Sequence, residues 1–136
     1  MPNGTELAGT LHHVEIYVSE LRRSLDFWGW FLERLGYRQI QSWEGGASYL
    51  LHDTYIVFVQ TGDRFKDVPY HRCRAGLNHL AFHAGSREAV DELTRLLEER
   101  GVTILYRDRH PHAGGEETYG VFFEDPDRIK VEFVAP

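Results

Sequence analysis

The chain has 136 residues, a formal net charge of −6 and 42% hydrophobic residues, which is typical of one soluble globular domain. No run of basic residues stands out, so we expect no nucleic-acid partner, and no apolar stretch approaches the ~20 residues that span a bilayer. Its one cysteine, Cys73, excludes an internal disulfide and a thiolate metal cluster.

The N-terminal residues MPNGTELAGT are polar and contain no apolar segment of the signal-peptide type. Together with the single cysteine, this predicts a cytoplasmic protein, because disulfides belong to oxidising compartments. The remaining chemical feature is the presence of eight histidines in a mildly acidic chain.

The first half of the chain predicts a strand, a helix and three more strands. Alternating side chains indicate a strand at residues 11–18. Apolar residues three and four positions apart indicate a helix that Ser19 would cap and Gly36 would end. Strand-like runs separated by turn residues then follow, at residues 37–43, 47–51 and 55–60.

The second half repeats this order when His13 is superposed on His79. A strand at residues 77–84 precedes a helix that Ser86 would cap and Gly101 would end. The strands that follow are predicted at residues 103–107, 119–123 and 129–134, with a long loop at residues 110–117. We therefore predict an α+β fold of two tandem βαβββ modules, in a single domain at residues 1–136. Its parts would be a first module at about residues 10–61, a linker at 62–75 and a second module at about 76–136.

Three of the predicted strands carry polar groups on one face. Because side chains alternate across a strand, His13 and Glu15 share a face of the first strand, and His79 and His83 share a face of its counterpart. Glu132 lies on the polar face of the last strand. Such faces often meet only water. If the two sheets curve toward each other, however, two imidazoles and one carboxylate would converge, a set that suits Fe(II), Mn(II), Ni(II) or Zn(II).

Three segments resemble motifs of the vicinal-oxygen-chelate superfamily, which includes glyoxalase I, bleomycin-resistance proteins, fosfomycin-resistance transferases and extradiol dioxygenases. They are the opening run from Leu11 to Trp28, the strand Gly76 to Phe82, and the closing run from Phe122 to Glu132, in which Arg128 stands where a turn glycine is usual. The resemblance implies curved, antiparallel-rich mixed sheets around a cup-shaped metal site. It also implies His13, His79 and Glu132 as ligands of a divalent metal ion, and a homodimer.

Departures from the family pattern bear on the reaction. Glyoxalase I has a fourth ligand on the last strand of its first module, and aligning residues 56–59 with residues 130–133 places Phe58 there, with Gln60 or Glu15 as substitutes. Phe122 stands where fosfomycin-resistance proteins and extradiol dioxygenases commonly have tyrosine. Glu15 is the candidate for proton transfer. The other residues expected to line the pocket are Tyr17, Phe58, Gln60, His83, Tyr119 and Phe122.

The sequence thus predicts a metal-dependent, glyoxalase- or dioxygenase-like enzyme that binds a small substrate through vicinal oxygens. It would be a lyase or isomerase, a transferase or a dioxygenase. One alternative is a module that sequesters a small molecule, as bleomycin-resistance proteins do. Another is an Fe(II) extradiol-type dioxygenase.

Overall fold

The structure is a computed structural model that describes residues 4–136. These residues divide into two compact units, one ending at Val68 and the other spanning Pro69–Pro136. Within the described residues, no helix has both the length and the apolar character needed to cross a membrane.

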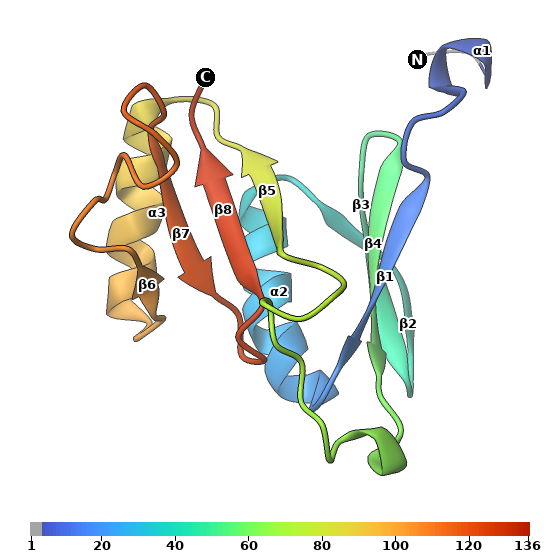
Figure 1. Cartoon of the computed structure of the whole chain (residues 1–136). Coiled ribbons are helices and arrows are strands. Elements are labelled where there is room, and N and C mark those ends of the chain that lie inside the picture. The colour runs from blue at the N-terminus through green and yellow to red at the C-terminus, as the bar shows by residue number, and fades with distance from the viewer. Residues whose placement is uncertain (1–3) are drawn as a thin grey trace. The chain divides into compact units, whose positions relative to one another are not determined.

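The first unit contains one four-stranded mixed sheet and the long helix α2 (Figure 1). In the sheet, β1 pairs in parallel with β4, while β4–β3 and β3–β2 are antiparallel, giving the order β1-β4-β3-β2. Its elements are α1 (Gly4–Leu7), β1 (His13–Val18), α2 (Leu21–Arg34), β2 (Arg38–Trp43), β3 (Gly46–Leu51), β4 (Thr54–Gln60) and the 3₁₀ turn η1 (Asp63–Phe65).

The second unit repeats this topology with the sheet order β5-β8-β7-β6. Its first and last strands again pair in parallel, and the other pairs are antiparallel. The elements are β5 (His79–His83), α3 (Arg87–Glu99), β6 (Ile104–Leu105), β7 (Gly120–Glu124) and β8 (Lys130–Val134). The prediction of two tandem βαβββ modules is therefore confirmed, although β6 is shorter than the strand expected at residues 103–107.

Both long helices end in the same backbone motif. Gly36 and Gly101 adopt left-handed conformations with φ of 100° and 73°. After α2, the N–H of Gly36 donates to the carbonyl of Glu33 and that of Tyr37 to the carbonyl of Leu32; the residues after α3 form the equivalent pair of bonds. This is the Schellman arrangement, so the predicted role of the two glycines is confirmed.

The helix starts agree with the sequence at one helix and differ at the other. Ser86 caps α3, and its hydroxyl accepts a hydrogen bond from the N–H of Ala89. The cap of α2 is Glu20 and not Ser19, because α2 begins at Leu21 and the Glu20 carboxylate accepts from the N–H of Arg23 at 3.3 Å. The prediction of a Ser19 cap was wrong by one residue.

The turn between β7 and β8 has the form that its sequence indicated. Oδ1 of Asp125 accepts hydrogen bonds from the N–H groups of Asp127 and Ile129, which closes a tight Asx-type turn. Arg128 has a φ of 67°, in the left-handed region that glycine adopts without strain. This backbone conformation explains why the related motif usually has glycine at this position.

Candidate functional site

The second unit brings two of the predicted metal ligands together. His79 begins β5 and Glu132 lies in the middle of β8. The parallel register places Glu132 opposite Ala81, whose small side chain leaves space for the carboxylate. As a result, Nε2 of His79 lies 3.4 Å from Oε1 of Glu132. The two side chains are 32% and 14% exposed, so the pair is sheltered without being sealed from solvent.

Asn78 fixes the other side of the imidazole. Its Oδ1 lies 2.7 Å from Nδ1 of His79, and because an amide oxygen only accepts, the hydrogen of a neutral ring resides on Nδ1. In this neutral form, the nitrogen without a hydrogen is Nε2, which faces Glu132. Metal-ligating histidines in proteins commonly have this arrangement, with one nitrogen free and the other donating to a fixed oxygen.

The pair opens onto a cavity of about 410 Å³ in the second unit. Phe122 forms one wall, because it lies opposite Glu132 in the β7–β8 ladder and meets His79 edge-to-face with ring centroids 5.9 Å apart. Phe122, which the sequence analysis expects in a substrate pocket, is thus one of the residues that line this cavity. The other lining residues are Tyr106, Arg109, Ala113, Gly114 and Lys130.

The acceptor atoms of this pair fit a divalent cation. An unprotonated Nε2 and a carboxylate oxygen are both acceptors, so their approach to 3.4 Å is favourable only with a proton or a cation between them. A Cβ on Gly114 would lie 3.4 Å from Oε2 of Glu132, so the glycine leaves that oxygen open to the cavity. Imidazole and carboxylate are ligands of Fe, Mn, Ni and Zn. Among residues 4–136, however, no group of three His, Cys, Asp or Glu side chains converges, so a third protein ligand is missing from this pair.

The first unit places His13 at the position that corresponds to His79. Each histidine begins the first strand of its module and lies opposite the last strand, His13 against Tyr55 and His79 against Lys130. The His13 ring stacks on Tyr55 at 4.7 Å, and Nε2 lies 3.8 Å from a carboxylate oxygen of Glu15. The Glu15 side chain is 60% exposed, so its carboxylate meets solvent.

His12 differs from its expected place. It falls within the strand predicted at residues 11–18, but β1 begins one residue later, at His13. His12 is exposed, and its Nδ1 lies 3.0 Å from Nδ1 of His13. One of these two nitrogens must carry a hydrogen, so each ring restricts the tautomer of the other.

The prediction that Phe58 lines the pocket was wrong. Phe58 is fully buried and stacks on Trp28 of α2 with centroids 5.0 Å apart. In the strand registers, Val57 lies opposite Glu15 just as Glu132 lies opposite Ala81. Val57 is therefore the counterpart of Glu132, and the expected alignment was displaced by one residue, which exchanges the two faces of a strand. A valine cannot ligate a metal, so this position still supplies no fourth ligand.

The side chain of Gln60 supports the start of α2 and does not line the pocket. Its Oε1 accepts from the N–H of Leu21 at 2.8 Å, while its Nε2 donates to the carbonyls of Ser19 and Thr61. These bonds engage both ends of the amide, so the prediction of Gln60 as a pocket residue or substitute ligand was also wrong.

Tyr119 faces α3 and lies outside the lining of the cavity. Its hydroxyl donates to Oδ1 of Asp91 at 2.6 Å, and the guanidinium of Arg87 lies 4.9 Å from its ring centroid. Hydrogen bonding to Asp91 and burial raise the pKa of Tyr119 above its usual value. The expected pocket role of Tyr119 was therefore wrong, because Tyr119 alternates with Phe122 across the sheet.

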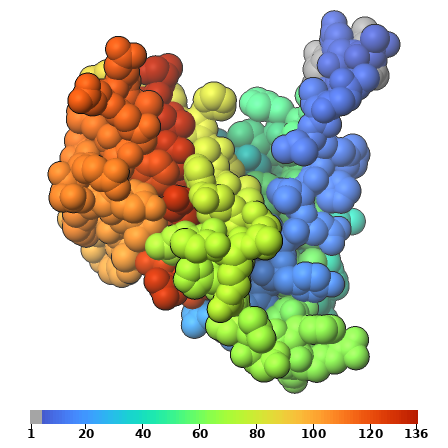
Figure 2. Space-filling view, in the orientation of Figure 1, coloured from blue at the N-terminus to red at the C-terminus, as the bar shows by residue number. Residues whose placement is uncertain are grey.

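Two further predicted residues lie on exposed surfaces. Tyr17 is 72% exposed on the face of β1 that carries Glu15. His83 is exposed at the end of β5 and is outside the lining of the cavity beside His79. The segment that precedes β5 is also exposed, at residues 73–78, and its surface can be seen in Figure 2.

Five of the residues that line the cavity were not predicted from the sequence, among them the polar side chains of Tyr106, Arg109 and Lys130. Lys130 could have been predicted from the sequence, because it alternates with Val131 along the strand and therefore shares the polar face of Glu132. For Tyr106 and Arg109 no comparable signal exists, since both belong to an irregular segment after β6. Tyr106 enters it with a φ of 57°, a conformation that is unusual for a bulky side chain.

Comparison with known proteins agrees with this topology. Residues 10–133 match the sequence model of the Glyoxalase/Bleomycin resistance protein/Dioxygenase superfamily. The chain belongs to this superfamily. It is 56% identical over 126 residues to the uncharacterized protein YqjT of Bacillus subtilis strain 168, covering 93% of this chain and 98% of that protein. It is also 28% identical over 123 residues to the glutathione transferase FosA of Serratia marcescens, covering 90% and 78%.

Solved structures of the superfamily share the fold. A putative glyoxalase from Bacillus halodurans has a TM-score of 0.95 and 62% identity, with 96% of this chain and 98% of that chain covered. The fosfomycin resistance protein FosX of Listeria monocytogenes has a TM-score of 0.68 and 21% identity, with 93% and 90% covered. At this lower identity the likeness concerns the fold alone.

Proposed function

We propose that the protein is a metal-dependent enzyme that binds a small substrate through two adjacent oxygens on a divalent cation. The observation that carries the proposal is the His79–Glu132 pair, in which Nε2 and Oε1 face each other at 3.4 Å beside a cavity. Asn78 supports the proposal because it leaves Nε2 as the free nitrogen of the ring.

His13 is the proposed third ligand. It occupies the same strand position in the first module that His79 occupies in the second, and its Nε2 is on the side of Glu15. The three ligands would come from one chain, or from two copies of the chain that exchange modules in a homodimer. When bound, the cation would act as a Lewis acid that stabilises negative charge on a substrate oxygen.

The protein's own side chains would perform the remaining tasks. The exposed carboxylate of Glu15 would accept and return a proton, because it lies 3.8 Å from Nε2 of His13 and forms no closer ion pair among residues 4–136. Phe122 would exclude water from one side of the His79–Glu132 pair. Val57, at the position corresponding to Glu132, has no donor atom, so three protein ligands would leave room for two substrate oxygens. This disfavours the four-ligand chemistry of glyoxalase I.

Metal analysis of protein purified without chelators tests the proposal. We expect one tightly bound Fe, Mn, Ni or Zn per site in the wild type, and occupancy that falls at least tenfold in His79→Ala and Glu132→Gln. His83→Ala is the matched control, since it removes an exposed histidine from the same strand and should keep the metal. Failure to bind any of these four ions after supplementation, or full occupancy in His79→Ala, would contradict the proposal.

Substrate assays then separate the reaction classes. Fosfomycin with glutathione should be assayed first, because a 28% identical relative is a glutathione transferase named FosA. Oxygen consumption with catechols would assign a dioxygenase, and isomerisation or cleavage without oxygen would assign the lyase or isomerase class. Stoichiometric ligand binding that is unaffected by metal would instead indicate a sequestering protein.

A further inference from the structure

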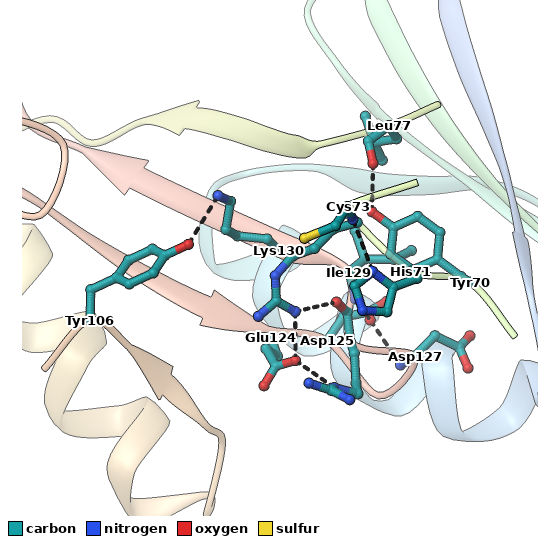
Figure 3. A network of polar contacts seen from close by, with 12 residues as sticks. Tyr70, His71, Cys73, Leu77, Tyr106, Glu124, Asp125, Asp127, Ile129 and Lys130 are labelled. Atoms are coloured by element: carbon teal, nitrogen blue, oxygen red, sulfur yellow. Dashed lines mark hydrogen bonds and ion pairs between the residues drawn. The ribbon is translucent and has the colours of Figure 1, made fainter. Parts of the chain in front are cut away.

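Two cationic side chains, Lys130 and Arg109, line the cavity beside His79 and Glu132. Lys130 lies opposite His79 in the β5–β8 ladder and shares a strand face with Glu132. Its Nζ donates to the hydroxyl of Tyr106 at 3.2 Å, as the dashed line in Figure 3 marks. The same ammonium lies 5.4 Å from the ring centroid of Tyr106 and 5.6 Å from that of Phe122, so two aromatic rings hold it in place.

The second cation is held by the same tyrosine. The carbonyl of Tyr106 accepts hydrogen bonds from the N–H groups of Arg109 and His110, both at 2.9 Å. This turn returns the guanidinium of Arg109 over the ring of Tyr106, 4.9 Å from its centroid. The left-handed backbone of Tyr106 begins the turn, and such conformations persist where the surrounding structure requires them. Tyr106 is thus in contact with both cations.

Neither cation has a counter-ion within the described part of the chain. No ion pair joins Lys130 or Arg109 to a carboxylate among residues 4–136, whereas Arg107, two positions before Arg109, pairs with Glu98 at 3.6 Å. The one carboxylate that lines the cavity belongs to Glu132, which faces His79. The half-buried Lys130 has a hydroxyl and two aromatic rings beside its ammonium but no counter-ion. Because an uncompensated charge is costly to shelter, an anion that enters the cavity would stabilise it.

We infer that Lys130 and Arg109 form a binding site for the oxyanion group of the substrate, with Tyr106 as the residue that positions both. The ligand class is a small molecule with a phosphate, phosphonate or carboxylate group beside the oxygens that reach the His79–Glu132 end. A guanidinium matches two oxyanion oxygens at once, and an ammonium adds a compact charge. This inference rests on the proposed function for the identity of the neighbouring site and names the substrate class for it.

The sequence allows a direct test, because Lys66 and Lys130 are its two lysines. Protein labelled with ¹³C-lysine is freed of metal with a chelator and titrated with inorganic phosphate, and the two side-chain signals are followed by NMR. We expect the Lys130 signal to shift saturably while the Lys66 signal, from a side chain paired with Asp63 at 3.2 Å, stays in place. Repeating the titration with methylphosphonate and acetate identifies the preferred oxyanion.

Variants locate the site within the cavity. Isothermal titration calorimetry measures the affinity of every variant, since Lys130→Met lacks the reporter signal. Lys130→Met and Arg109→Gln should each weaken phosphate binding at least tenfold, whereas the matched controls Lys66→Met and Arg107→Gln should bind as the wild type does. Tyr106→Phe keeps the ring but removes the hydroxyl, so it should weaken binding less than Lys130→Met. Glu132→Gln should tighten phosphate binding to metal-free protein, because it removes the opposing negative charge.

The outcomes separate this inference from the proposed function. Equal, unsaturable shifts of both lysine signals, or wild-type affinity in Arg109→Gln, would overturn the oxyanion site. Metal content is measured on the same preparations. Protein that binds metal but not oxyanions would refute this inference alone, and protein that binds oxyanions at Lys130 but no metal would refute the proposed function alone.

Discussion

Oδ1 of Asn78 lies 2.7 Å from Nδ1 of His79, on the side of the ring opposite to Glu132. The residue before the proposed ligand therefore determines which nitrogen of the ligand is free. It does so across a single peptide bond, at the start of a strand whose register already places His79 beside β8.

Replacing Asn78 by alanine should therefore weaken metal binding about 10- to 100-fold, as losses of such supporting hydrogen bonds commonly do. Competition with a chelating dye measures the affinity. ¹⁵N NMR of the metal-free protein should show His79 shifting from the Nδ1–H form toward a mixture of tautomers. Asn78→Asp keeps an oxygen acceptor and is the matched control. An unchanged tautomer and affinity in Asn78→Ala would contradict the role of Asn78.

Phe58→Ala should lower the free energy of unfolding by about 3–5 kcal/mol, the usual cost of removing a buried phenyl ring. The reason is its stacking on Trp28 in the core of the first unit. Chemical denaturation measures the loss, and Phe65→Ala, which removes a 60% exposed ring, should change stability by less than about 0.5 kcal/mol. Phe58→Leu should keep the metal content of the wild type. If Phe58→Ala were as stable as the wild type but bound metal differently, Phe58 would have to be assigned to the pocket.

Gln60→Leu should destabilise the protein by about 1–3 kcal/mol, because it removes the partners of the Leu21 N–H and of two carbonyl groups. Glu20→Ala, which removes the longer 3.3 Å cap bond at an exposed site, should have the smaller effect. Denaturation curves of both variants give the comparison. If Gln60→Leu instead retained stability and lost metal, the amide would have to be assigned to the site.

The stability of the protein should decrease as the pH falls below about 6.5, in part through His110. Burial lowers the pKa of His110 below its usual value of 6.5, against the smaller opposing effects of Asp91 and Glu98. The unfolded chain therefore binds the proton more readily than the folded one, so protonation favours unfolding. His110→Gln should make the loss of stability between pH 7.5 and 5.5 shallower. An equally steep loss in the variant would show that the pH dependence arises elsewhere.

Where side chains alternate clearly, the sequence was sufficient to predict which face of a strand each residue occupies. His79 and Glu132 alternate with apolar residues in β5 and β8, and each was assigned to the correct face. Gly36 and Gly101 were equally clear, because a helix that ends in a Schellman motif favours a residue without a Cβ. These local patterns carry information about faces and ends of elements.

Where alternation is absent, the sequence could not fix the register. Ile56, Val57 and Phe58 are all buried, so nothing in their order distinguishes the face toward α2 from the opposite face. The position of Arg109 at the cavity was missed for another reason. Arg109 lies in a turn that begins with the left-handed conformation of Tyr106, and tyrosine is not a residue whose presence indicates such a turn.

In each module the first strand pairs with the last, and this topology determines the order in which the two sheets can form during translation. Every strand of the first sheet is available once residues through Gln60 have emerged. β5, in contrast, has no neighbouring strand until β8 is synthesised, because β7 and β6 lie beyond β8 in the sheet. Contacts between distant parts of a chain form slowly. His79 and Glu132 should therefore meet late in biosynthesis, after the sheet that carries His13 has been completed.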